Sequence, residues 1–223
     1  MTTSTQNALR EQLVQAAHLL FQAGVMSHSG HGNMSARLPG TDHMLLTATG
    51  VISQLKPEQL TVVTFDGEPV EGTLEPVTRE IVGMHSCIYA ARPDVGAVIH
   101  THSPAVTSFA LAHESLPCAY EAMLRFGVTE DIPVAAWAPR GSQASVNNIV
   151  QQLQQSSTTP AVLLANHGLL AFGRDPLAVA YLIIAMEEAA ELTLSARAIG
   201  GEKPFPAGAL EQERKHMQQF GSL

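Results

Sequence analysis

The order in which helix and strand signals follow one another constrains the fold of this 223-residue chain more than any other feature. Short strand segments alternate irregularly with longer helical segments, and turn signals such as Asp66-Gly67 follow some of the strands. Strands are expected over 34–38, 43–47, 61–65, 97–101, 133–137, 161–165 and 169–172. Helices are expected over 7–23, 78–91, 104–112, 142–155, 176–199 and 209–219. This mixture predicts an α/β fold, a single domain over residues 1–223 with a β-sheet covered by helices.

Three polar residues are expected at the beginnings of helices, because each has a side chain that suits a helix N-terminus. Thr78 is the predicted cap of the second helix, Ser142 opens the fourth, and Asp175 precedes the proline that starts the longest one. Within that longest helix, the acidic run at 187–191 is predicted to form a solvated or interface face.

The charge balance and the apolar pattern exclude several classes of function. The net charge is −8 and no basic block is present, so we expect no nucleic acid partner. The apolar runs fall far short of the ~18 residues that span a bilayer, so we expect no membrane partner. The first residues have no apolar signal core. Two cysteines, Cys87 and Cys118, are too few for a disulfide framework and predict a cytoplasmic protein with ordinary buried thiols.

Histidines give the strongest indication of chemistry in this sequence. His100 and His102 lie at the end of the strand over 97–101, and residues two apart on a strand share one face. His167 lies between two apolar strand segments, where Gly168 would let the backbone approach closely. Three histidines with one open position form the ligand pattern of a catalytic zinc site. The cofactor is therefore expected to be a divalent metal, Zn2+ first, with Mn2+ or Co2+ as alternatives.

The histidines also have an interpretation that involves no metal. Taken alone, His-x-His at 100–102 is equally well explained by two unrelated polar residues at the end of a strand. His85, on a predicted helix, is expected to be a hydrogen-bonded structural residue rather than a metal ligand.

Four motifs make the chain resemble the class II aldolase/adducin family, which includes fuculose-phosphate aldolases. They are HGNMSAR (31–37), TATG (47–50), RPDVGAVIHTHSPAV (92–106) and LLANHGLLAFG (163–173), and their order and spacing match from Leu9 to Ala198. The resemblance implies an α/β/α fold around a mostly antiparallel sheet. It also implies a homotetramer with active sites at the subunit interfaces and a small-molecule substrate.

The resemblance also assigns residues to the site. The family's three metal ligands match His100, His102 and His167, and its substrate-anion pocket matches Gly32, Asn33, Thr49 and Gly50. Backbone N–H groups of a glycine loop and a small hydroxyl suit an anion, because they donate hydrogen bonds without adding bulk. Without the resemblance, Gly32-Asn33 would be interpreted as a turn before a strand.

The chain departs from the family where its aldolases have a Ser-Ser-Glu triplet, whose serines help to hold phosphate and whose glutamate is the acid/base. An ungapped match places Arg79, Glu80 and Ile81 there, so both serines are missing and the carboxylate is displaced by one residue. Glu80 is a candidate proton carrier or fourth metal ligand in the first turn of the predicted helix, with a helix-capping surface glutamate as the alternative. Arg79 is a candidate partner for a substrate carboxylate or phosphate, with a solvated arginine as the alternative.

Glu121 is a second departure, at a position where several aldolases have a tyrosine thought to protonate the leaving aldehyde. An unpaired carboxylate is costly on a mostly apolar segment. Glu121 therefore either points to water or faces the metal site as a functional acid.

Together these features predict an enzyme, a divalent-metal-dependent lyase of the aldolase type. It would cleave a carbon–carbon bond of a small hydroxy-carbonyl or sugar-phosphate-like substrate through a metal-stabilised enediolate. A decarboxylase of a hydroxy or keto acid is the alternative, because carbon dioxide leaves without a base that removes a hydroxyl proton. A non-catalytic adducin-like interaction domain is a third possibility, less favoured because all three histidines are present.

Overall fold

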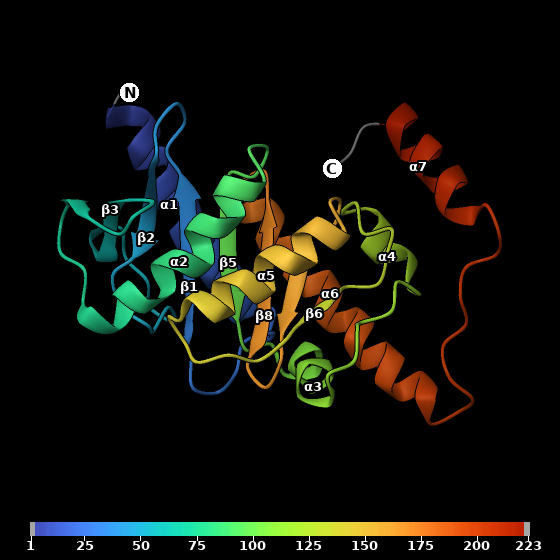
Figure 1. Cartoon of the computed structure of the whole chain (residues 1–223). Coiled ribbons are helices and arrows are strands. Elements are labelled where there is room, and N and C mark those ends of the chain that lie inside the picture. The colour runs from blue at the N-terminus through green and yellow to red at the C-terminus, as the bar shows by residue number, and fades with distance from the viewer. Residues whose placement is uncertain (1–2, 221–223) are drawn as a thin grey trace.

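An eight-stranded sheet runs through the centre of the protein in the order β4-β3-β2-β1-β5-β8-β7-β6 (Figure 1). The computed structural model describes residues 3–220. The strands are β1 Gly32–Arg37, β2 His43–Thr47, β3 Leu60–Thr64, β4 Pro69–Glu71, β5 Ala97–Thr101, β6 Val134–Ala135, β7 Ala161–Leu164 and β8 Gly168–Gly173. All neighbouring strands are antiparallel except β6 and β7, which are parallel. The mostly antiparallel sheet is therefore confirmed.

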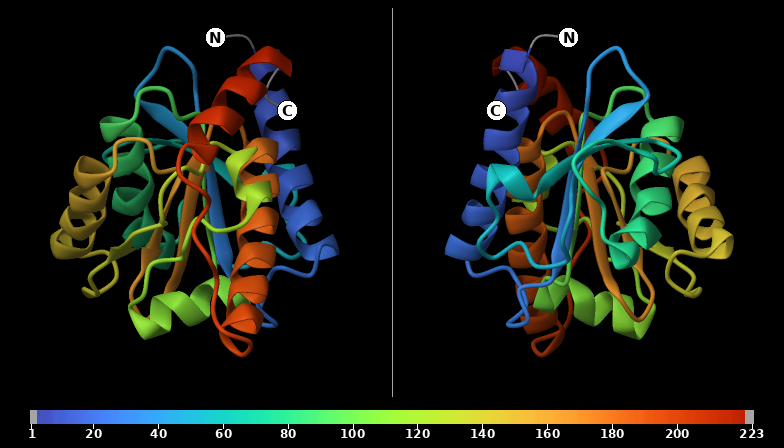
Figure 2. Two further views of the ribbon diagram at one scale, coloured as in Figure 1. Left: turned by 90° about the vertical axis from the view of Figure 1, so that its right-hand side faces the viewer. Right: turned by 90° about the vertical axis from the view of Figure 1, so that its left-hand side faces the viewer.

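Helices cover both faces of this sheet. They are α1 Thr3–Gln22, α2 Pro76–Ala91, α3 Pro104–Ala112, α4 Glu121–Leu124, α5 Gln143–Gln155, α6 Pro176–Arg197 and α7 Ala209–Phe220, with a short 3-10 turn at Pro57–Gln59. Figure 2 shows α1 and α6 on one face and α2 and α5 on the other. The expected α/β/α arrangement is therefore confirmed. Among the described residues, no helix has the length and apolar character needed to cross a bilayer.

The central strand β5 separates two hydrophobic cores. Ala97 and Ile99 pack into the core that α1 and α6 share. Val98 packs into the core on the side of α2 and α5. A strand buried on both faces has a continuous apolar sequence instead of an alternating one, which explains the unbroken run before His100.

The N-terminus of α2 differs from the prediction. The helix begins at Pro76 with Glu75 at the cap position, because proline suits the first turn. Thr78 therefore does not cap the helix, and its hydroxyl donates a hydrogen bond to the Ala48 carbonyl, 3.0 Å away. Glu80 consequently lies in the second turn and not, as expected, in the first, so the helix N-terminus does not stabilise its charge there.

The other two predicted caps are confirmed. Ser142 accepts a hydrogen bond from the Ser145 N–H, and Asp175 accepts one from the Ala178 N–H. The sequence did not indicate β4 or α4, which are only three and four residues long and too short to show a periodic pattern. The strand expected over 133–137 is shorter in the structure, where β6 covers only Val134–Ala135. It pairs with β7 at the edge of the sheet.

The acidic run in α6 corrects another expectation, because Glu187 is buried and does not face solvent. Its carboxylate accepts the backbone N–H groups of Ala105 and Val106, at 2.8 and 2.9 Å. These are orphan donors in the first turn of α3, which otherwise would lack partners. Glu187 therefore fixes α3 immediately after His102.

Candidate metal centre

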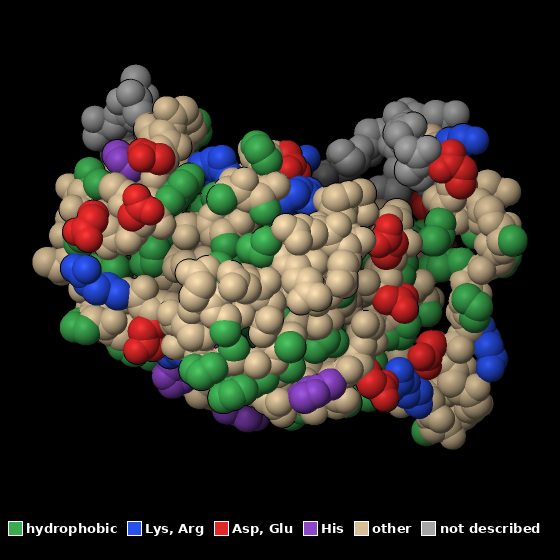
Figure 3. Space-filling model, in the orientation of Figure 1, with side chains coloured by type: hydrophobic (Ala, Val, Ile, Leu, Met, Phe, Trp, Pro, Cys, Tyr) green, Lys and Arg blue, Asp and Glu red, His purple; other side chains and the backbone are tan. Residues whose placement is uncertain are grey.

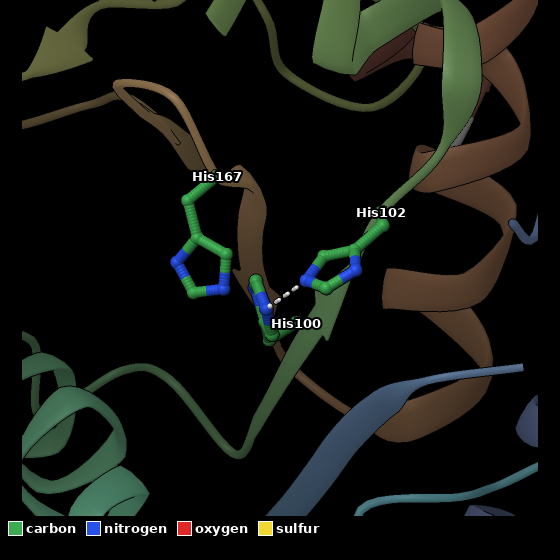
Figure 4. A group of neighbouring side chains, drawn as sticks. All are labelled: His100, His102 and His167. Atoms are coloured by element: carbon green, nitrogen blue, oxygen red, sulfur yellow. Dashed lines mark hydrogen bonds between the residues drawn. The ribbon is translucent and has the colours of Figure 1, made fainter. Parts of the chain in front are cut away.

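Three histidines from two segments of the chain converge at one end of the sheet (Figure 4). His100 is on β5, His102 follows that strand, and His167 lies in the turn between β7 and β8. One ring nitrogen from each lies within 4.8 Å of the other two. The Nε2 atoms of His100 and His102 are 3.1 Å apart. Nitrogen ligands of one tetrahedral zinc ion lie about 3.3 Å apart, given Zn–N distances of about 2.0–2.1 Å, so these side chains fit a shared cation.

The turn that presents His167 requires the glycine that follows it. A Cβ atom at Gly168 would lie 2.5 Å from the Thr101 carbonyl oxygen and 2.9 Å from Cδ2 of His102. Asn166, before His167, has a positive φ of 58°. The close approach expected at Gly168 is thus confirmed, and it brings β8 against the end of β5.

The histidine rings are held in the neutral form that binds a metal. Nδ1 of His100 donates a hydrogen bond to the Leu169 carbonyl oxygen, 2.8 Å away, which leaves Nε2 with a lone pair. Burial, followed by the neighbouring His167 and His102, keeps the pKa of His100 well below its usual value. Burial also lowers the pKa of His102, and it lowers the pKa of His167 to about 4. At neutral pH all three imidazoles are therefore uncharged, which is the form that a metal ion requires.

A cavity of about 370 Å³ opens beside the histidines. Of the residues predicted to bind substrate, Gly32, Asn33 and Gly50 line it. Figure 3 shows histidine side chains along the lower edge of the molecule, where this end of the sheet meets solvent.

Three predicted site residues are not among the described residues that line this cavity. The Thr49 hydroxyl donates a hydrogen bond to the Val51 carbonyl. Arg79 is exposed at the surface of α2, and Glu121 is exposed at the start of α4. Within a single chain, the cavity therefore lacks the arginine and one of the two carboxylates that the sequence suggested.

A buried hydrogen-bond chain orients Asn33. The Tyr89 hydroxyl and the Ser35 hydroxyl are 2.7 Å apart, and Ser35 Oγ lies 2.7 Å from Nδ1 of His85. Nε2 of His85 lies 2.6 Å from Oδ1 of Asn33. Burial lowers the pKa of His85 to about 3, so this ring is neutral and donates from Nε2 to the amide oxygen. The structural role expected for His85 is confirmed, and with Oδ1 engaged, Asn33 has its NH2 group left to donate.

The sequence did not indicate two prominent residues of the cavity, Trp137 and Arg140. Both lie in the loop between β6 and α5, and Trp137 is 62% exposed. Nε of Arg140 lies 3.2 Å from a carboxylate oxygen of Glu80, which also lines the cavity. After burial and other histidines, the positive charge of Arg140 contributes to the lowered pKa values of His102 and His167. Arg140 thus lies within electrostatic reach of the histidine cluster.

The chain is similar to proteins of known function. Residues 11–194 match the family described as Class II Aldolase and Adducin N-terminal domain. A 5-methylthioribulose-1-phosphate/5-deoxyribulose-1-phosphate aldolase from Rhodospirillum rubrum is 30% identical over 215 residues, 96% of this chain and 93% of that protein. A 3-oxo-tetronate 4-phosphate decarboxylase from Escherichia coli is 30% identical over 209 residues, 90% of this chain and 91% of that protein.

The same fold occurs in a solved structure of an L-fuculose 1-phosphate aldolase. The TM-score is 0.84 at 24% sequence identity, over 98% of each chain. At this level of identity, the comparison supports the fold and leaves the substrate to be inferred from the site.

Proposed function

The chain belongs to the class II aldolase and adducin family, and from that premise we propose that it is a divalent-metal-dependent lyase that cleaves a carbon–carbon bond in a small phosphorylated hydroxy-ketone. The observation that carries the proposal is the convergence of three neutral imidazoles beside a cavity of substrate size. His100, His102 and His167 hold the cation, and the open position fits a catalytic site. Zn2+ is the first choice, and Mn2+ and Co2+ suit the same ligands.

When bound, the cation supplies Lewis-acid polarisation of a substrate carbonyl group. The protein's own residues bind the substrate and move protons. Among the described residues, Glu80 is the only carboxylate that lines the cavity, and we assign it the proton transfer. In the retro-aldol (cleavage) direction, a proton leaves the hydroxyl group on the carbon that becomes the aldehyde. The electron pair of the broken bond stays with the ketone fragment, which then takes up a proton.

The cavity wall supports a substrate with one polar end and one apolar end. Gly32, Asn33 and Gly50 contribute small polar surfaces to the wall. The same wall also contains the apolar side chains of Ile81, Met84 and Trp137. The relative from Rhodospirillum rubrum is named for a deoxy or methylthio sugar phosphate, which has both characters.

Decarboxylation is the second candidate, and Ile81 is the observation that favours it. Ile81 is buried and replaces the acid/base glutamate expected from the family resemblance. Loss of carbon dioxide leaves the same kind of carbanion without prior removal of a hydroxyl proton. The decarboxylase relative, with 30% identity, supports this alternative.

We further propose a cytoplasmic homotetramer with sites at subunit interfaces. Exposed apolar residues support an interface, among them Tyr181, Leu192 and Ile199, the last 89% exposed. Glu121 lines no part of its own chain's cavity, so its proposed role as an acid requires a neighbouring subunit. Cys87 and Cys118 are both free, which is typical of a reducing compartment. Light scattering of the purified protein tests the assembly, and a monomer would remove the role of Glu121.

The reaction is tested by incubating the zinc-loaded protein with 5-deoxyribulose 1-phosphate and, separately, with a 3-oxo acid phosphate. We expect a short aldehyde and a shortened ketone phosphate from the first. Carbon dioxide from the second without any aldehyde from the first would select the decarboxylase. Neither product, in protein that holds zinc, would support a non-catalytic adducin-like domain.

A further inference from the structure

Arg140 is a cation at the wall of the cavity that the reaction described above does not use. Its side chain is 50% exposed, and its Nε pairs with Glu80. Its Nη2 donates a hydrogen bond to the Val77 carbonyl, 3.1 Å away. Among the described residues no partner satisfies Nη1, so a planar, permanently charged donor group remains for a ligand.

The rest of the anion pocket is short of donors. The Gly32 N–H is already engaged by the Gly50 carbonyl, and the Thr49 hydroxyl by the Val51 carbonyl. At the two positions where the family resemblance leads us to expect phosphate-binding serines, this chain has Arg79, which does not line the cavity, and Glu80, which does. A carboxylate at the wall repels a phosphate dianion. An anionic substrate group therefore needs a compensating cation.

The loop that carries Arg140 is fixed against α2. Gly141 has a φ of +73°, and a Cβ atom there would lie 3.0 Å from Cβ of Glu80. Ser142, the next residue, caps α5. The backbone on both sides of this contact is therefore held, and it keeps Arg140 beside Glu80 and the histidine cluster.

We propose that Arg140 is the cationic anchor for the phosphate group of the substrate, and that Glu80 is its counter-ion until the phosphate displaces it. This inference rests on the proposed function, which supplies a phosphorylated substrate. A phosphate dianion competes well for the guanidinium group, because it carries more charge than one carboxylate and accepts two parallel N–H groups. Displacement also releases Glu80 for the proton transfer, so binding of the phosphate end prepares the carboxylate at the reacting end.

Calorimetric titration of the zinc-loaded protein with inorganic phosphate tests the anchor without turnover. We expect Arg140→Ala to weaken phosphate binding by about tenfold or more, and Arg140→Lys to retain part of the affinity as a point charge. Glu80→Gln should act in the opposite direction and tighten phosphate binding, because the competing carboxylate is gone. Arg174→Ala is the matched control, since Arg174 follows the opposite end of β8, and it should bind phosphate like the parent.

Steady-state kinetics separate the anchor from a merely structural residue. Arg140→Ala should raise KM for the phosphorylated substrate by the same factor by which it weakens phosphate binding. It should lower kcat by a smaller factor and leave the zinc content unchanged. Titration with acetate shows whether the site selects phosphate or accepts any anion, and equal affinity for both would overturn the phosphate assignment. Phosphate affinity unchanged in Arg140→Ala, or weakened in Glu80→Gln, would overturn the anchor itself. A protein that binds phosphate through Arg140 but cleaves nothing would instead overturn the proposed function.

Discussion

At the scale of single residues, the candidate centre combines ligands held by local geometry with groups kept neutral by burial. His100 is buried, and its Nδ1 is fixed by a carbonyl oxygen of the adjacent strand. His102 and His167 are partly buried and face the cavity. Removal of one ligand should therefore affect metal binding much more than it affects the packed cores.

Substitution His102→Ala is expected to reduce zinc affinity by more than the roughly 10–100-fold that loss of an outer-shell partner causes. The unfolding curve of the metal-free protein should stay close to that of the parent, because His102 lies at a strand end and not in a core. Zinc content after dialysis, measured by atomic emission, checks the first point. His18→Ala, an exposed histidine on α1, is the control, and tight stoichiometric zinc in His102→Ala would reject this ligand set.

His85 is expected to make stability depend on pH. Burial lowers its pKa in the folded protein to about 3, below the unfolded value of 6.5. Below pH 6.5 the unfolded chain binds a proton that the folded chain does not, so this contribution to stability is complete above 6.5 and falls as the pH drops toward 3. The loss is up to about 1.4 kcal/mol per pH unit. Urea unfolding at pH 7 and pH 5 should show a smaller difference for His85→Gln, and an equal difference would show that His85 is not the cause.

The sequence identified the histidines but not the arginine, for a physical reason. His100 and His102 share a face because strand geometry has a period of two, a rule that needs only neighbouring residues. Arg140 is placed by the packing of a loop against α2, so nothing near it in the sequence distinguishes it from a solvated arginine such as Arg79. The role of Glu80 stayed open because the helix cap lies at Glu75, three residues before the expected Thr78, which changes the place of Glu80 on the helix.

At the scale of elements, the site depends on the contact between β5 and the turn that begins β8. Gly168 allows that contact, since the Thr101 carbonyl oxygen occupies the space of a side chain there. The helix after His102 is held in turn by the buried Glu187. The sequence predicted the ends of β5 and α3 correctly, because apolar runs and proline mark them. The prediction of a solvated or interface face was wrong for Glu187, because a contact between α6 and α3 leaves no mark in the local sequence pattern.

Substitution Gly168→Ala should disturb both the sheet and the metal centre. The added Cβ atom would lie 2.5 Å from the backbone oxygen of Thr101 and 2.9 Å from the His102 ring, so β8 must shift away from β5. We expect a loss of about 2–4 kcal/mol in the free energy of unfolding, together with weaker zinc binding. Denaturant unfolding and zinc titration check these results. Gly24→Ala is a control for a glycine with no atom near its Cβ position, although its own positive φ adds strain. Parent-like zinc affinity in Gly168→Ala would show that this contact does not position His167.

At the scale of the whole molecule, the cation should stabilise the fold because the unfolded chain has no preformed site. Zinc at about 100 times its dissociation constant should add about 2.7 kcal/mol, which raises Tm by about 5–11 °C for a domain of 150–250 residues. Thermal unfolding with zinc and with a chelator checks this prediction. His102→Ala should show little of this shift, and a full shift in that variant would locate the stabilising ion elsewhere.

The overall architecture was well predicted, because alternating apolar segments and the four motifs cover most of the chain. The edge strand β4 was not predicted, because all three of its residues are exposed and leave no hydrophobic signal. The assembly of several chains cannot be derived from local patterns at all. Whether Glu121 takes part in chemistry is decided at this largest scale.

The pairing of β5 with β8 also sets the order in which the protein acquires its activity. The carbonyl group that fixes His100 belongs to Leu169, 69 positions further along the chain. A ribosome must therefore release most of the polypeptide before the first and third imidazoles meet, and a nascent fragment that contains only the His-x-His segment has two ligands and no third. We therefore expect the newly made chain to bind its metal ion only after this long-range closure.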